Sequence, residues 1–253
     1  TDEHRVDNLW LVVGAEVESK AAWLEVASNG QQFTVSRVPF VYNRPHAVSS
    51  FYPERGPEHG ATQVVISGAG FANGSDYKCR FGGSTVNASY DAVGETVHCA
   101  SAPHAPYTAS LEVSINAQQF TRDAVGFTYY AGPIVSVVSP DAGPAAGDTL
   151  VRLFGEGRDA GRNYRCRFGE TVVNGTIDLT RPNATLLCVS PSAAAQLLSD
   201  GTRNVSLEVS LNSQDFTSDG RIFTYFEPPS VSALLPSDGM FYGRTSVVVR
   251  GSG

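Results

Sequence analysis

Hydrophobic and polar residues alternate along a stretch that occurs three times in the chain. It reads LEVASNGQQFT at residues 24–34, LEVSINAQQFT at 111–121 and LEVSLNSQDFT at 207–217. An apolar residue at every second position is typical of a half-buried β-strand, with one side in the core and the other in water. The alternation therefore predicts three equivalent strands whose polar residues, such as Glu112, Ser114, Glu208 and Ser210, face solvent.

A second motif recurs in register with the first and divides the chain into repeats. The motif P-x-x-G-x-x-x-G-x-T begins at Pro53, Pro140 and Pro236. Internal repetition is a more direct signal of domain organisation than length. We expect the C-terminal half of a repeat at 1–44, complete repeats at 45–132 and 133–228, and the N-terminal part of another at 229–253. We therefore also expect the sequence to be a piece of a longer protein.

Within a complete repeat, apolar runs separated by turn residues predict about seven short strands. The glycine-rich motif is interpreted as a turn, and the polar stretch between YKCRF and TVHC as a connection. Short strands with frequent turn signals in about 90 residues are typical of an antiparallel immunoglobulin-like β-sandwich. The fold class is thus predicted as all-β, with tandem sandwiches. Very short links between the repeats predict that they stack as a semi-rigid rod.

Composition narrows the class of partner. The formal net charge is −7, and 42% of residues are hydrophobic, which is ordinary for a globular protein and unfavourable for binding a phosphate backbone. We expect no nucleic-acid partner. The sequence contains no G-x-S-x-G, H-E-x-x-H or G-x-x-x-x-G-K motif, so we expect no catalytic, metal or cofactor site.

The four cysteines fall two to each complete repeat. We expect disulfides within the repeats, which would join Cys79 to Cys99 and Cys166 to Cys188. Closing such a loop stabilises a fold by roughly 3 kcal/mol and requires an oxidising compartment. The alternative is four buried free thiols in a cytosolic protein. Spacing typical of a zinc site is absent.

Five N-x-S/T sequons indicate the same compartment. They begin at Asn73, Asn87, Asn174, Asn183 and Asn204. In a secreted protein each is a candidate for N-glycosylation, and the alternative is an ordinary solvated loop residue.

Three aromatic residues are candidate contact residues. Trp23 occupies a position that holds Ser110 and Ser206 in the other copies, so it is predicted to point outward. In the last glycine-rich turn, Phe241 and Tyr242 stand where the earlier repeats have Glu58 and His59 or alanines. An outward tryptophan either anchors a partner or packs on a neighbouring domain, and the apolar turn suggests contact across a repeat junction.

Together, the P-x-x-G-x-x-x-G-x-T opening, the G-x-G-F at residues 68–71, the C-R-F-G strands at 79–82 and 166–169 and the closing F-T-Y resemble the IPT/TIG domain. With paired cysteines, the chain is most similar to the extracellular plexin, Met and fibrocystin-like branch of that family. The resemblance spans the whole sequence as two complete and two partial repeats.

This resemblance implies a non-catalytic binding and spacer array in the ectodomain of a membrane receptor or adhesion protein, with its anchor outside this fragment. Expected partners are a protein or glycan ligand at the cell surface and neighbouring TIG repeats. One alternative is an accessory region of a secreted carbohydrate-active enzyme. A second is an intracellular TIG region of a transcription factor, which the acidity and paired cysteines disfavour.

Overall fold

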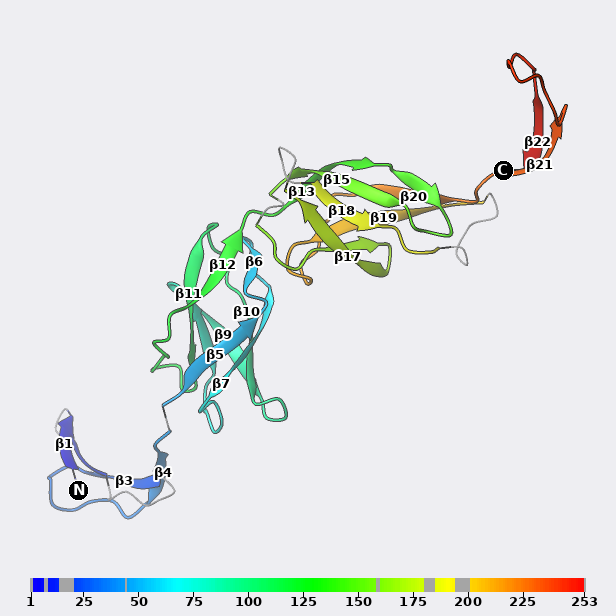
Figure 1. The fold of residues 1–253 in the computed structure, drawn as a ribbon. Coiled ribbons are helices and arrows are strands. Elements are labelled where there is room, and N and C mark those ends of the chain that lie inside the picture. Colours follow the sequence, from blue (N-terminus) through cyan, green and yellow to red (C-terminus); the bar gives the residue numbers. More distant parts are fainter. Residues whose placement is uncertain are drawn as a thin grey trace. The chain divides into compact units, whose positions relative to one another are not determined.

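A computed structural model describes residues 2–6, 9–13, 21–43, 45–157, 160–179, 185–193 and 201–252. The described residues form β-strands and contain no helix (Figure 1). The all-β prediction is therefore confirmed. The chain forms two compact units. One comprises Thr1–Phe51, Val65–Cys99 and Leu111–Val125, and the other Tyr52–Val64, Ala100–Ser110 and Gly126–Gly253.

Residues 45–132 form eight strands. These are β5 (Ala47–Tyr52), β6 (Arg55–Pro57), β7 (Gln63–Ala69), β8 (Lys78–Phe81), β9 (Ser84–Asp91), β10 (Thr96–Ala100), β11 (Thr108–Ser114) and β12 (Val125–Tyr130). Their order by hydrogen bonding is β5-β7-β10-β9-β8-β11-β12-β6.

Residues 133–228 form eight strands in the same order, β13-β15-β18-β17-β16-β19-β20-β14. These are β13 (Ile134–Ser139), β14 (Ala142–Pro144), β15 (Leu150–Glu156), β16 (Arg165–Phe168), β17 (Thr171–Asp178), β18 (Thr185–Val189), β19 (Thr202–Ser210) and β20 (Ile222–Phe226). Equivalent strands from two stretches of sequence therefore adopt one topology.

The strand β17 belongs to both layers of this sandwich. Residues 171–174 pair with β16, and residues 175–178 pair with β18. β9 divides in the same way, with residues 84–87 on β8 and 88–91 on β10. In the second repeat the enclosed core includes Val151, Leu153, Phe168, Leu186, Leu207, Phe223 and Tyr225. Burial of this apolar surface is the main stabilising contribution.

The described ends of the chain form smaller groups of strands. The first contains β1 (Asp2–Val6), β2 (Leu9–Val13), β3 (Ala21–Ala27) and β4 (Val38–Val41), in that order. The last is an antiparallel pair, β21 (Ser230–Leu235) and β22 (Val248–Ser252).

Each complete repeat has eight strands where about seven were predicted, and two of the eight lie in segments that were not read as strands. The three-residue β6 and β14 pair in parallel with β12 and β20 inside the glycine-rich motif that was interpreted as a turn. The polar stretch read as a connection is β9, where every second residue is exposed and the others are only half-buried. Its polarity reflects that exposure.

The prediction that the polar side of the repeated strand faces water was wrong. Ser114 and Ser210 are fully buried, and Glu208 is 6% exposed. The segment after each strand folds back over that side, because isolated β-bridges join Ser114 to Phe120 and Ser210 to Phe216. Alternation correctly indicated opposite sides of the strand, but a covering loop removes both sides from solvent.

Candidate functional site

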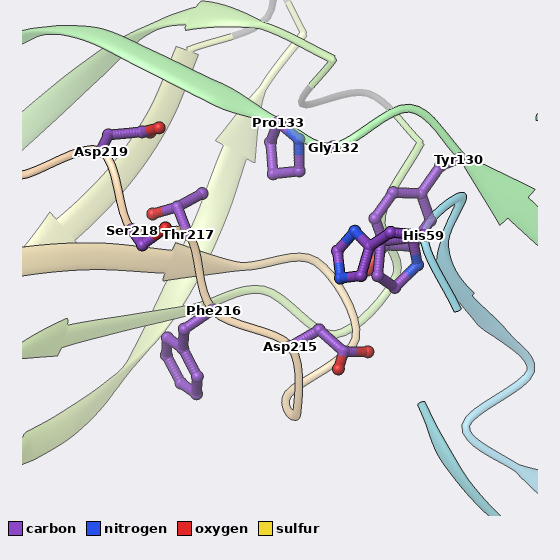
Figure 2. Close-up of a pocket in the computed structure, with 10 residues that line it drawn as sticks. His59, Tyr130, Gly132, Pro133, Asp215, Phe216, Thr217, Ser218 and Asp219 are labelled. Atoms are coloured by element: carbon purple, nitrogen blue, oxygen red, sulfur yellow. The ribbon is translucent and has the colours of Figure 1, made fainter. Parts of the chain in front are cut away.

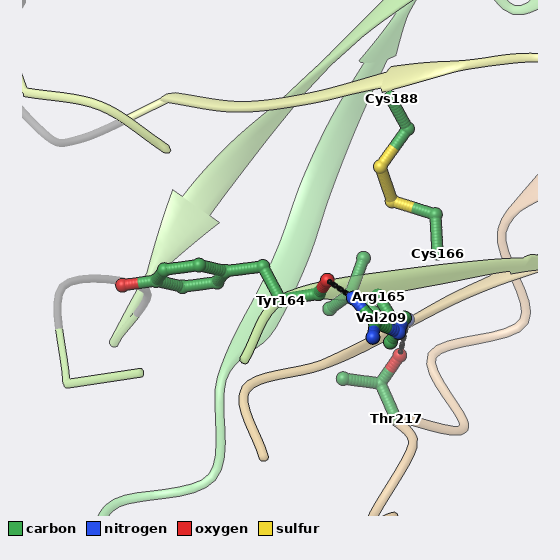
Figure 3. The surroundings of a disulfide bond; sticks show 6 residues. All are labelled: Tyr164, Arg165, Cys166, Cys188, Val209 and Thr217. Atoms are coloured by element: carbon green, nitrogen blue, oxygen red, sulfur yellow. Dashed lines mark hydrogen bonds between the residues drawn. A yellow bond between two sulfur atoms is a disulfide. The ribbon is translucent and has the colours of Figure 1, made fainter. Parts of the chain in front are cut away.

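The cysteines lie in the cores of the two sandwiches. The structure pairs Cys79 with Cys99 and Cys166 with Cys188, each with a Cα–Cα distance of 6.4 Å. All four are at least 96% buried. Figure 3 shows the second bridge joining β16 to β18, which belong to different layers of the sandwich. The bridges therefore tie the layers together and are inaccessible to ligands.

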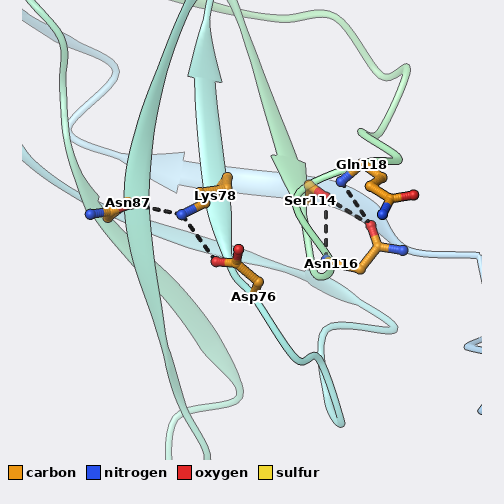
Figure 4. Close-up of polar contacts among 6 residues, drawn as sticks. All are labelled: Asp76, Lys78, Asn87, Ser114, Asn116 and Gln118. Atoms are coloured by element: carbon orange, nitrogen blue, oxygen red, sulfur yellow. Dashed lines mark hydrogen bonds and ion pairs between the residues drawn. The ribbon is translucent and has the colours of Figure 1, made fainter.

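Four of the five sequons lie among the described residues, and Asn183 lies outside them. Asn73, Asn87, Asn174 and Asn204 are all exposed. Asn87 and Asn174 occupy equivalent positions, opposite Lys78 on β8 and Arg165 on β16. Asn87 Oδ1 accepts a hydrogen bond from Lys78 Nζ at 2.8 Å, and its Nδ2 points away from the lysine (Figure 4). This strand position therefore presents an accessible amide in both repeats.

The three predicted contact residues are accessible. The exposed fractions are 53% for Trp23, 100% for Phe241 and 66% for Tyr242. Phe241 and Tyr242 contact each other edge to face, with ring centroids 5.4 Å apart. A partner contact for any of them stays a prediction.

A loop closed by an asparagine side chain follows each of the three repeated strands. In the last copy, Asn212 Oδ1 accepts hydrogen bonds from the backbone N–H of Gln214 at 3.0 Å and Asp215 at 2.9 Å. Asn116 Oδ1 accepts the same two bonds from the N–H groups of Gln118 and Gln119, and Asn29 Oδ1 accepts them from Gln31 and Gln32. Figure 4 shows the bond between Asn116 and Gln118. We call residues 116–119 and 212–215 the Asn loops. An asparagine that bonds the backbone two residues on is a common way to form a tight turn.

The threonine at the end of the motif anchors the far side of each loop. Thr217 donates its backbone N–H to Val209 O at 2.8 Å, and its Oγ1 accepts the Val209 N–H at 3.1 Å (Figure 3). Thr121 and Val113 make the same pair of bonds at 2.8 and 3.1 Å. The final threonine of the motif therefore continues the pairing of the strand.

Beneath this loop, charged and aromatic side chains fill the covered polar side of the strand. The Arg167 guanidinium lies 4.5 Å from the Phe216 ring centroid, and Thr217 Oγ1 donates to Glu208 Oε2 at 2.7 Å. The first repeat has Arg80 4.2 Å from Phe120 and ion-paired with Glu112. These contacts satisfy groups that alternation alone would have placed in water.

Within the second compact unit, the Asn loop at 212–215 contacts residues 52–64 of the first complete repeat. Asp215 Oδ2 accepts hydrogen bonds from Thr62 Oγ1 at 2.7 Å and from Asn212 Nδ2 at 2.6 Å. Asn212 Nδ2 also donates to Arg55 O at 3.0 Å. Thr62 is fully buried and Asn212 is 1% exposed. A carboxylate therefore satisfies two donors that are removed from water at this contact.

Further polar contacts surround this carboxylate. Gln63 and Gln214 bond reciprocally, with Gln63 N–H to Gln214 Oε1 at 3.2 Å and Gln214 Nε2 to Gln63 O at 3.0 Å. Tyr52 OH donates to Asn212 O at 3.3 Å, and Arg55 donates to Ala160 O. Because main-chain acceptors and paired amides take part, the contact is specific in geometry as well as in charge.

A pocket of about 190 Å³ lies beside this contact (Figure 2). It is lined by Pro57, His59, Tyr130, Gly132, Pro133 and residues 215–219. Tyr130 is 3% exposed, and its hydroxyl has no hydrogen-bond partner among the described residues. Burial raises the pKa of Tyr130, the Asp215 carboxylate raises it further, and Arg55 opposes the shift. The phenol is therefore neutral across the physiological range.

The sequence carries a signal for the Asn loops. Asn29, Asn116 and Asn212 recur at one position of the motif, and an asparagine directly after a strand is a turn signal with a mechanism. The contact with Thr62 had no such signal, because it joins residues 153 apart.

Two kinds of site are absent from the described part of the chain. Its histidine, cysteine and acidic residues include no group of three or more that could hold a metal ion. No helix among these residues is long and apolar enough to cross a membrane.

The model of the family described as IPT/TIG domain matches residues 45–129 and 133–225. Plexin-B2 of Mus musculus is 29% identical over 215 residues, covering 83% of this chain and 11% of the relative. Plexin-A3 of Homo sapiens is 24% identical over 243 residues, covering 92% of this chain and 12% of the relative. The chain thus spans about a ninth to an eighth of the length of these relatives.

A solved structure of the full extracellular region of Plexin A4 is similar in fold. It matches with a TM-score of 0.52 and 16% sequence identity, over 97% of this chain and 26% of that chain.

The equivalent exposure of Asn87 and Asn174 predicts that both carry an N-glycan after secretion from eukaryotic cells, since the modification requires an accessible amide. Glycopeptide mass spectrometry should find both sites occupied, and Asn87→Gln and Asn174→Gln should each remove one glycan. Glycan at other sequons with none at these two would contradict the prediction.

Alkaline pH should destabilise the sandwiches through their buried tyrosines. Burial raises the pKa of Tyr225 to about 12, partly opposed by Arg203, and burial raises that of Tyr129 to about 12. Each phenol therefore holds its proton more tightly in the folded state than in the unfolded state. The stabilisation that each protonated phenol contributes is fully present below about pH 10 and is lost as the pH rises towards about 12.

For Tyr225 the expected loss between about pH 9 and pH 11 is about 1 kcal/mol. Urea unfolding of Tyr225→Phe at both pH values should show a smaller loss than the unsubstituted chain, because one titrating phenol is gone. Tyr107→Phe, which alters an exposed phenol, is the control. An equal loss in all three proteins would be the contrary result.

Proposed function

The chain belongs to the IPT/TIG domain family and is a non-catalytic extracellular region of such repeats, and we propose that it spaces and orients the binding parts of a larger cell-surface receptor or adhesion protein. Its partners would be a protein or glycan ligand and the neighbouring repeats. The net charge of −7 argues against nucleic acid. The whole protein would be a receptor or adhesion molecule rather than an enzyme.

The observation that carries this proposal is the Asp215 contact. A spacer transmits position only if adjacent repeats are tied together, and only three residues, 131–133, separate β12 from β13. The Asp215–Thr62 and Asn212–Arg55 bonds, with the Gln63–Gln214 pair, add a restraint outside the connecting chain. A short link supported by buried hydrogen bonds limits the relative motion of the two repeats.

Family likeness favours this role over the two alternatives, since the similar proteins are plexins. We further propose that residues 1–44 and 229–253 belong to two additional repeats, flanking complete repeats at 45–132 and 133–228. Trp23, Phe241 and Tyr242 are then contact residues of those partial repeats, consistent with their exposure.

Replacing the Asp215 carboxylate directly tests whether this contact restrains the two repeats. Asp215→Ala leaves the Thr62 hydroxyl and the Asn212 amide without this acceptor, so the contact should weaken by about 1–3 kcal/mol. Backbone ¹⁵N relaxation should show the two complete repeats tumbling together in the unsubstituted chain and with shorter, separate correlation times in the variant.

Gln119→Ala is the matched control. Gln119 occupies the equivalent position in the first Asn loop, where its side chain bonds to Asn116. This variant should tumble like the unsubstituted chain. Unchanged relaxation in Asp215→Ala would show that the buried carboxylate does not restrain the repeats.

A further inference from the structure

The surface that receives the Asn loop is duplicated in the second complete repeat. We call residues 53–62 the first receiving turn and residues 140–149 the second. Each contains a short strand, β6 or β14, that pairs in parallel with the last strand of its repeat. Each also holds its glycine against its threonine, because a Cβ at Gly56 or Gly143 would collide with the hydroxyl of Thr62 or Thr149.

Backbone hydrogen bonds fix both receiving turns in the same form. Ala61 N–H donates to Ser101 O at 2.8 Å, and Asp148 N–H donates to Ser190 O at 2.9 Å. Glu58 N–H and Ala145 N–H donate to the last residues of β12 and β20, both at 2.8 Å. The second receiving turn therefore has the backbone conformation that binds an Asn loop at the first receiving turn.

The two receiving turns differ in solvent exposure, as expected if only the first binds an Asn loop in this structure. Thr62 is fully buried beneath the Asn loop at 212–215, whereas Thr149 is half-buried. Leu150 follows Thr149 and is 42% exposed. The Asn loops differ similarly, since the docked Asn212 is 1% exposed and Asn116 is half-buried.

We propose that the second receiving turn binds the Asn loop of the TIG repeat that follows it in the same protein, an inference that rests on the proposed spacer function. The contact of the loop at 212–215 with the first receiving turn indicates which features the bound loop should have. An asparagine closes its loop, and a carboxylate three residues later accepts the Thr149 hydroxyl, as Asp215 accepts that of Thr62.

The pairing of Gln214 can recur at the second turn, because both of its partners on Gln63 are backbone groups, the N–H and the C=O. Leu150 occupies the equivalent position and carries the same two groups. A glutamine two residues after the asparagine of the partner loop would therefore find both a donor and an acceptor on Leu150.

Hydrogen–deuterium exchange followed by mass spectrometry tests the proposal without identifying the partner residues. Peptides covering residues 140–150 are compared between the 253-residue chain and the whole ectodomain. Docking should slow their exchange about tenfold in the ectodomain, because opening then requires loss of the contact. Peptides covering 54–64 should be protected in both proteins, and the turn at 91–96 should exchange equally in both.

Two variants of the whole ectodomain locate the effect. Thr149→Arg places a large cation on the turn and should restore fast exchange at 140–150. Thr149→Val removes only the hydroxyl, keeps the backbone bonds of the turn and should restore it in part. Protection of 140–150 that is unaffected by either variant would assign the occupant to another surface and overturn the proposal.

The other outcomes separate this inference from the proposed function. Equal exchange at 140–150 in both proteins, with 54–64 protected, would overturn the inference and leave the spacer function standing. Fast exchange at 54–64 in both would contradict the spacer function itself. Protection of 140–150 that grows with the concentration of the 253-residue chain would assign the turn to a second copy and reject a loop from the same protein.

Discussion

The carboxylate of Asp215 satisfies a constraint on which the junction in the second unit depends. Polar groups removed from water must be hydrogen-bonded, or the fold loses the free energy of their hydration. Thr62 and Asn212 are both buried, and one carboxylate oxygen accepts from each of them. Asn212 lies in the same loop as Asp215, whereas Thr62 belongs to the preceding repeat, so the bond to Thr62 is available only while the two segments remain in contact.

The same segment of chain has a second role inside its own repeat. Residues 212–217 cover the polar side of β19, where Arg167 stacks on Phe216 and Glu208 accepts from Thr217. The loop that touches the preceding repeat is therefore anchored by the core of its own sandwich. Such anchoring matters for a spacer, because a flexible loop would lose conformational entropy on contact and give a weaker restraint.

Sequence alone predicted the repeats, the strand that carries the motif and the all-β class, because these follow from periodicity and from turn residues. It did not predict the burial of Ser114, Ser210 and Glu208, since alternation separates the two sides of a strand without indicating what covers each side. It also missed β9, whose exposed outer residues make it polar. The contact between Asp215 and Thr62 was beyond its reach, because pairing between distant positions leaves no periodic signal.

Cross-linking within one chain tests most directly whether the Asn loop is seated on the preceding repeat. Thr62→Cys with Asp215→Cys places two thiols where side chains bond at 2.7 Å in the structure. The account predicts rapid formation of a disulfide in the monomer, with the native bridges intact by peptide mapping. The equivalent positions Thr149 and Gln119, changed to cysteine together, should form none within one chain. Failure of the first pair, or equal linkage of the second, would contradict the account.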